Sequence, residues 1–135
     1  MLFLLRGSIM SIESRKNGYI SLMQTVCPSA KFTFEENEDG YTLKDVSTST
    51  ELRVLSIPDF VTELGVGCCS GITYLESVYL TSSIKRVGVG CFGNCKNLTE
   101  VRIPKSLKSF ESDLLRYTRA SIEYYTDENI ANITE

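Results

Sequence analysis

Three glycines in the middle of the chain have the spacing of a phosphate-binding loop. Within residues 87–95, which read VGVGCFGNC, Gly88, Gly90 and Gly93 spell GxGxxG. Such a loop binds a dinucleotide only where a strand precedes it, a crossover helix follows and an acid lies about 20 residues further on. Too few residues separate Gly93 from the next apolar segment to form that helix. The motif therefore does not predict a nucleotide site, and we expect no cofactor.

Glycines return at the same positions one repeat earlier in the chain. Gly65 and Gly67 precede Gly88 and Gly90 by 23 residues. A requirement that recurs at a fixed period is structural, because a ligand loop has no reason to repeat. We expect tight turns, where one backbone passes close to another or takes a positive φ.

Cysteines are the second group of residues with chemical potential. Cys68, Cys69, Cys91 and Cys95 have a CC…CxxxC spacing, which is not that of a zinc ribbon or knuckle. They stand at positions that are otherwise apolar, and a free cysteine packs as a small hydrophobe. We predict free thiols buried in a core, with no metal.

Composition narrows the function classes further. The 135 residues include no histidine, which removes Ser-His-Asp and Cys-His catalysis and histidine zinc sites. No paired-carboxylate pattern stands out, so an enzyme is not expected. The apolar fraction of 42% and the charged fraction of 23% indicate one folded domain. A net charge of −3 gives no reason to expect a nucleic-acid partner.

A repeat of 23 residues organises the middle of the chain. The blocks 52–74, 75–97 and 98–120 align with coinciding apolar columns. Three of these columns are Leu52/Leu75/Leu98, Leu55/Val78/Val101 and Ile57/Leu80/Ile103. Each L-x-x-[LV]-x-[IL] segment alternates as a short strand does, and only stacked blocks bury a continuous core. The sequence predicts a solenoid.

The full pattern, L-x-x-[LV]-x-[IL]-P-x-x-V-x-x-[LI]-G-x-x-[AC]-F-x-x-C, resembles the BspA-type leucine-rich repeat over residues 52–120. This resemblance implies a short bacterial or phage protein with a right-handed, mostly β α/β solenoid. It also implies strands on the concave side and an interaction or adhesion role. The third block departs from the pattern, with Glu111 where Gly65 and Gly88 stand, and is interpreted as a degenerate terminal repeat.

The flanking segments are expected to cover the solenoid ends. Residues 31–51 predict a β-hairpin cap with a turn at Asp39-Gly40, whose first strand extends the concave sheet. The acids at its tip, Glu35, Glu36, Glu38 and Asp39, indicate a solvated loop rather than a metal site. Residues 121–135 predict a C-terminal strand and tail, with Tyr124 in the column of Val101. Residues 1–30 are left without an assigned structure.

Strand alternation predicts the exposed face on which a partner would bind. Its two outward rows are Val54, Ser77, Glu100, Glu123 and Ser56, Tyr79, Arg102, Tyr125. Tyrosine and arginine are enriched at interface hot spots, so Tyr79, Arg102 and Tyr125 are the leading binding residues, joined by Ser56, Ser77 and Glu100. The alternative is ordinary cross-strand packing on a solvated sheet.

We therefore expect a non-enzymatic module that binds a protein or a surface glycan. The alternative is a structural or assembly component, such as a fragment of a larger repeat protein or a phage structural protein. Self-association through the solenoid ends is a further expectation. We expect no membrane span, and the apolar run before Arg6 is too short for a signal peptide. The sequence thus favours the cytoplasm, whereas the resemblance favours the cell surface.

Overall fold

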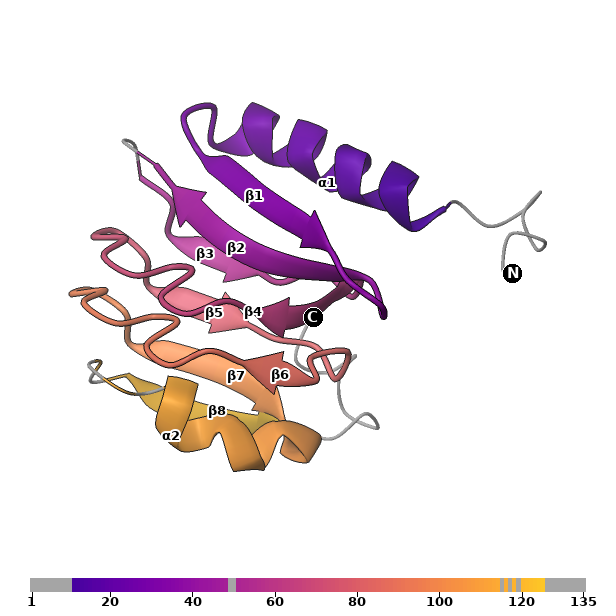
Figure 1. Cartoon of the computed structure of the whole chain (residues 1–135). Helices are drawn as coiled ribbons and strands as arrows, with labels where there is room; N and C mark the ends of the chain where they lie inside the picture. The colour runs from indigo at the N-terminus through magenta and orange to yellow at the C-terminus, as the bar shows by residue number, and fades with distance from the viewer. Residues whose placement is uncertain (1–10, 49–50, 115, 117, 119, 126–135) are drawn as a thin grey trace.

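The structure is a computed structural model that describes residues 11–48, 51–114, 116, 118 and 120–125. In chain order its elements are α1 (Ile12–Val26), β1 (Lys31–Glu36), β2 (Tyr41–Ser47), β3 (Val54–Ser56), β4 (Val61–Leu64), β5 (Ser77–Tyr79), β6 (Arg86–Val87), β7 (Glu100–Pro104), the 3-10 helix η2 (Lys105–Phe110), α2 (Glu111–Leu114) and β8 (Ser121–Tyr125). The strands form two sheets of four, in the orders β1-β2-β4-β6 and β3-β5-β7-β8 (Figure 1).

The two sheets are the two sides of a coiled chain. Val54 pairs with Ser77 and Ser77 with Glu100 in one sheet, and Glu63 pairs with Arg86 in the other. These partners lie 23 residues apart and their strands are parallel, so the chain returns to the same position after each coil. The predicted solenoid, mostly β, is confirmed.

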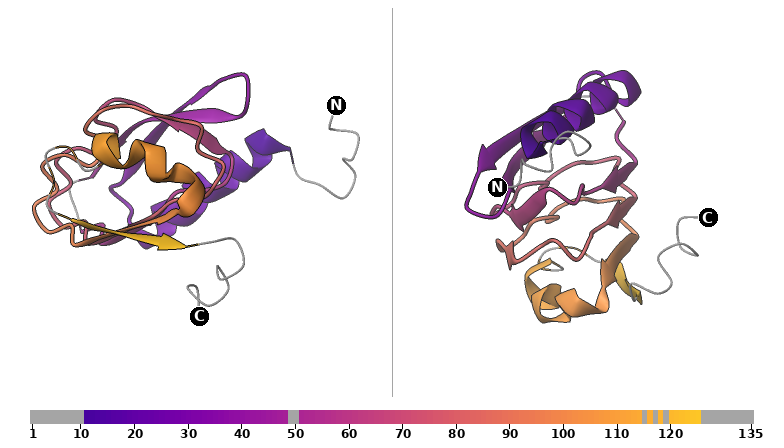
Figure 2. Two further views of the ribbon diagram at one scale, coloured as in Figure 1. Left: turned by 90° about the horizontal axis from the view of Figure 1, so that it is seen from below. Right: turned by 90° about the vertical axis from the view of Figure 1, so that its right-hand side faces the viewer.

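The core lies between the sheets and runs through all the coils. Leu55, Val78 and Val101, stacked at the centres of β3, β5 and β7, have no exposed surface. The five cysteines are free and buried, as predicted. Figure 2 looks along the stack in its left view and shows the coils lying over one another. Hydrogen bonds also join the coil corners, as where Cys69 N donates to Cys91 O at 2.8 Å.

The glycine turns follow the structural prediction. Gly67 and Gly90 have φ values of 61° and 71°, in the left-handed region that favours glycine. Gly88 is required for a different reason. A Cβ on Gly88 would lie 2.4 Å from the backbone nitrogen of Val66, in the coil above. Gly88 and Gly90 of the GxGxxG motif are therefore required by the stacking of the coils and by a turn.

The hairpin enters the sheet opposite to the one that we predicted. β2 pairs in parallel with β4, with Leu43 beside Leu64, and Gly65 N donates to Leu43 O at 2.9 Å. β1 pairs with β2 alone and forms the edge of that sheet, so it does not extend the β3 sheet. The prediction was wrong because β2, rather than β1, continues the repeat, in the position of a second strand.

Helix α1 covers the N-terminal end of the stack together with the hairpin (Figure 2, right). It begins after Ser11, whose side chain accepts a hydrogen bond from Ser14 N at 3.1 Å, as an N-cap residue does. Its Tyr19 ring packs edge-on against Phe32, Phe34 and Phe60. The Tyr19 hydroxyl donates to the carbonyl oxygen of Ser56 at 3.1 Å, on the edge strand β3.

The C-terminal coil is irregular. η2 and α2 stand where the preceding coils have their second strand and turn, and β8 then pairs with β7 (Figure 1). A strand at this place was predicted, but its register is two residues off. Ile122 lies beside Val101, whereas Tyr124 lies beside Ile103. The 23-residue count fails here because the helical segment replaces the regular half-coil.

Candidate interaction face

The outward side of the β3-β5-β7-β8 sheet holds most of the predicted binding residues. We call it the strand face and define it by the outward side chains of its four strands: Val54, Ser56, Ser77, Tyr79, Glu100, Arg102, Ser121 and Glu123. The alternate residues of the same strands point into the core. Parallel pairing sets Ser56 beside Tyr79 and Tyr79 beside Arg102.

Arg102 is the centre of a polar network on this face. Its Nε donates to Glu100 Oε2 at 2.7 Å and forms an ion pair with Glu123 Oε1 at 2.9 Å. The guanidinium carbon lies 5.3 Å from the centre of the Tyr79 ring, within the range of a cation–π contact. Ser77 Oγ donates to Glu100 Oε1 at 3.4 Å. The contacts hold the guanidinium in one place over the ring.

The charge of Glu100 is maintained by its neighbours. Partial burial acts to raise the pKa of this carboxyl, but its hydrogen bonds with Arg102, Glu123 and Ser77, together with the positive charge of Arg102, outweigh it and lower the pKa. Glu100 is therefore ionised under neutral conditions. An ionised Glu100 is what fixes the position of Arg102.

A second arginine with two carboxylates lies at the margin of the strand face. Arg53, which precedes β3, donates from Nη1 to Glu76 Oε2 and from Nη2 to Glu51 Oε1, both at 2.6 Å. Glu76 stands directly before β5. The arrangement repeats that of Arg102, which also joins an acid two residues earlier to one on the next coil. We did not anticipate this group from the sequence, although the order Glu51-x-Arg53 matches Glu100-x-Arg102.

Tyr125 does not stand in the row where it was predicted. Glu123 occupies the position beside Arg102, and Tyr125 pairs with Pro104, two residues further along β7. The cause is the shifted register of β8. The alternation in Ser121-Ile122-Glu123-Tyr124 matches that in Glu100–Ile103, and this signal gives the correct register from the sequence.

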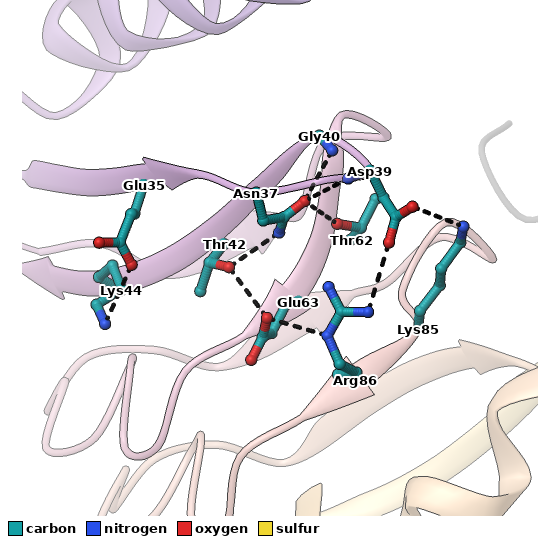
Figure 3. Close-up of polar contacts among 10 residues, drawn as sticks. All are labelled: Glu35, Asn37, Asp39, Gly40, Thr42, Lys44, Thr62, Glu63, Lys85 and Arg86. Carbon is teal, nitrogen blue, oxygen red and sulfur yellow. Dashed lines mark hydrogen bonds and ion pairs between the residues drawn. The ribbon is translucent and has the colours of Figure 1, made fainter.

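A second polar cluster lies on the other sheet, at the hairpin turn (Figure 3). Asn37 Oδ1 accepts hydrogen bonds from the backbone nitrogens of Asp39 and Gly40, both at 2.8 Å, and from Thr62 Oγ1 at 3.2 Å. Asn37 Nδ2 donates to Thr42 Oγ1 at 2.9 Å. These bonds shape the turn and satisfy the hydroxyls of two buried threonines, so the cluster has a structural role.

Ion pairs extend this cluster to the next coils. Asp39 meets Lys85 at 3.5 Å and Arg86 at 3.4 Å, and Arg86 Nε lies 3.1 Å from Glu63 Oε1 (Figure 3). The acidic loop was expected to be solvated, but one of its acids, Asp39, forms ion pairs with Lys85 and Arg86. Within the described part of the chain, no group of three or more cysteine, aspartate or glutamate side chains has a metal-binding arrangement.

The thiols of Cys68 and Cys91 are kept protonated. The pKa of Cys68 is raised by the hydrogen bond of its thiol to Cys69 and by burial. The pKa of Cys91 is raised by the contact of its thiol with Cys68 and by burial. Cys91 Sγ donates to the carbonyl oxygen of Gly88 at 2.8 Å. Since thiolates are the reactive form, these cysteines serve packing.

Coils with one parallel strand on each side, a leucine-rich core and a capped end define a leucine-rich-repeat solenoid. The BspA type leucine rich repeat region matches residues 43–135, more than half of the sequence, and the chain belongs to this family. The match begins within β2, which agrees with the pairing of this strand to β4. Proteins of this family are in general protein-binding or surface repeat proteins.

Two solved structures are similar to the chain. One is a leucine-rich repeat protein from Bacteroides ovatus, with 27% identity over 56% of this chain and 19% of that one, and a TM-score of 0.47. The other is a leucine rich cell surface protein from Faecalibacterium prausnitzii, with 18% identity over 75% of this chain and 40% of that one, and a TM-score of 0.43. The chain spans less than half the length of either. No curated protein matches it.

The helices in the described ranges are too short or too polar to cross a lipid bilayer.

Proposed function

We propose that the chain is a non-enzymatic interaction module that binds a protein partner on its strand face. The observation that carries this proposal is the ordered group of Tyr79, Arg102, Glu100 and Glu123. Interface hot spots are enriched in tyrosine and arginine, and side chains held in place before binding lose less entropy on association. The stacked strands of a solenoid present an extended surface that suits contact with another protein.

Selection from a phage-displayed random peptide library tests this proposal, with binding of the enriched peptides measured by biolayer interferometry. Tyr79→Ala and Arg102→Ala each remove a central contact, so we expect affinity to fall at least tenfold, as for hot-spot residues. Lys44→Ala, on the opposite sheet, is the matched control and leaves affinity within twofold.

Peptides that bind all three variants equally well would place the interaction elsewhere and overturn the assignment of the site. A glycan array run in parallel covers the other class of ligand. Binding to a glycan alone, lost in Tyr79→Ala, would replace the protein partner with a carbohydrate one.

A further inference from the structure

Arg102 on the strand face and Arg53 at its margin each form ion pairs with two carboxylates. Arg53 is held by Glu51 and Glu76. Arg102 is held by Glu100 and Glu123. Each group of three carries a net charge of −1, so the two groups together leave the strand side of the molecule negative.

Three of these carboxylates have acceptor capacity left. Glu51, Glu76 and Glu123 each meet an arginine through one oxygen, and their side chains are 52%, 47% and 55% exposed. Among the described residues, Glu51 and Glu76 have no second partner, whereas the Glu123 carboxyl also contacts that of Glu100. A carboxylate has about four lone-pair positions, so each can accept further bonds from a partner that approaches from solvent.

Negative charge is not peculiar to the strand side. On the opposite sheet Glu35 meets Lys44, and Asp39 and Glu63 share Arg86, but Glu36, Glu38 and Asp45 form no ion pair with a described residue (Figure 3). The strand side is selected by the proposed function, and its two acidic groups set the sign of the charge that a partner meets there.

The space between the two acidic groups suits aliphatic chains. Val54 is 50% exposed at the edge of the face, and small hydroxyl side chains at Ser56, Ser77 and Ser121 lie across the strands. Lysine and arginine bury their methylene stems on such surfaces while their charged ends reach polar groups at the rim. A negatively charged segment would instead meet surplus carboxylates.

Resting on the proposed function, we infer that the partner presents a basic segment, rich in lysine or arginine, to the strand face. The stems lie over Val54 and the serines, and the cationic ends bind the exposed carboxylates of Glu76 and Glu123. Charge complementarity of this kind also accelerates association at low ionic strength.

The probes are fluorescently labelled peptides of alternating lysine and serine, or of alternating glutamate and serine, about ten residues long. Fluorescence anisotropy measures their binding to the full chain at low and physiological salt. We expect the lysine peptide to bind, with affinity falling as salt rises, and the glutamate peptide to show no binding.

The double variant Glu76→Gln/Glu123→Gln tests the site. Two exposed ion pairs are lost, so we expect the affinity for the lysine peptide to fall roughly three- to tenfold. Glu36→Gln/Glu38→Gln is the matched control, since it removes the same charge from exposed acids of the hairpin and leaves affinity within twofold. Circular dichroism verifies that both variants are folded.

Equal losses in the two double variants would reveal general attraction to an acidic protein and overturn the inference. So would failure of the lysine peptide to bind. The peptide library distinguishes that failure from failure of the proposed function. Enriched peptides whose binding depends on Tyr79 but that lack basic residues would support the proposed interaction module and contradict the basic partner. Enriched peptides whose binding is unaffected by the Tyr79 and Arg102 substitutions would contradict both proposals.

Discussion

Single glycines set the distance between neighbouring coils. At Gly88 the chain passes so close to Gly65 and Val66 that a methyl group would overlap their backbone atoms. Backbone atoms held by hydrogen bonds on both sides cannot move aside as the end of a flexible side chain can. The site thus tolerates only glycine, although its own φ lies outside the left-handed region.

Gly88→Ala is expected to lower the free energy of unfolding by at least about 2 kcal/mol, because the coils must separate to admit the new methyl group. Gly18→Ala is the matched control in α1, where nothing lies within 4 Å of the added carbon. It should raise stability by about 0.5–1 kcal/mol, as alanine favours helix. Urea denaturation measures both changes. Similar stabilities for the two variants would contradict the close approach.

Glu100 makes the stability of the fold depend on pH in the acidic range. Its pKa is lower in the folded protein than the ordinary value of 4.5. A lowered pKa stabilises the fold above the unfolded pKa, and this contribution is lost as pH falls through the folded pKa. We therefore expect Glu100→Gln to be less stable than the natural protein near pH 7, with the difference shrinking as pH falls below that ordinary value. Denaturant unfolding at several pH values measures it, and a difference that stays constant with pH would contradict the prediction.

Among the elements, α1 matters for what it covers. β3 is an edge strand, and an uncovered edge invites pairing with other chains. Tyr19 closes part of that edge by its hydrogen bond to Ser56 and fills the space among Phe32, Phe34 and Phe60. Arg15 adds an ion pair to Asp59 at 3.0 Å. The helix is thus attached by aromatic packing and polar contacts, with Met23 as its buried aliphatic residue.

Tyr19→Phe keeps the ring and removes the hydroxyl, leaving the Ser56 carbonyl without this donor. We expect a loss of about 0.5–1.5 kcal/mol in the free energy of unfolding. Tyr74→Phe is the control, because Tyr74 is 45% exposed, and it should change stability by less than about 0.5 kcal/mol. Thermal melting of the two variants gives the comparison. An unchanged Tyr19→Phe protein would mean that solvent replaces the hydrogen bond.

The repeating elements and their register could be predicted from the sequence, whereas at the ends the hairpin and the last strand were predicted with the wrong pairing or register and α1 was not predicted at all. The strands that contain Leu55, Val78 and Val101 could be predicted because each coil buries the same positions against the next coil. α1 carries little such signal, since Met23 is its one buried side chain and Leu22 and Val26 are exposed. A helix that packs on only one end of the solenoid has no repeated apolar pattern from which it could be predicted.

The candidate site shows the same division. Tyr79 and Arg102 were placed side by side because their coils keep the 23-residue period. Tyr125 was misplaced and Glu123 overlooked as the partner of Arg102, because the irregular third coil shifts the register. The Arg102 side chain points toward two carboxylates because of its rotamer, and the spacing of residues in the sequence does not predict rotamers.

Across the whole molecule, stability should be uneven along the stack. β5 has a strand on each side and a fully buried Val78, whereas α1 lies at the end. In a solenoid each coil is stabilised by its neighbours, so the middle opens last. Hydrogen–deuterium exchange followed by mass spectrometry should find slower exchange in residues 77–80 than in residues 12–26. Equal protection of both segments would indicate that the chain opens only as a unit.

The constant offset between neighbouring coils also bears on how such a chain can change over generations. Glu63 meets Arg86, and Ser77 meets Glu100, through the same step of 23 residues. A duplication of 23 codons inside the regular coils would add one rung to both sheets and leave the contacts at either end unaltered. A gene of this design can lengthen by whole rungs and acquire a wider surface with new outward side chains, while the shorter insertion of a single codon would disturb every pairing beyond it.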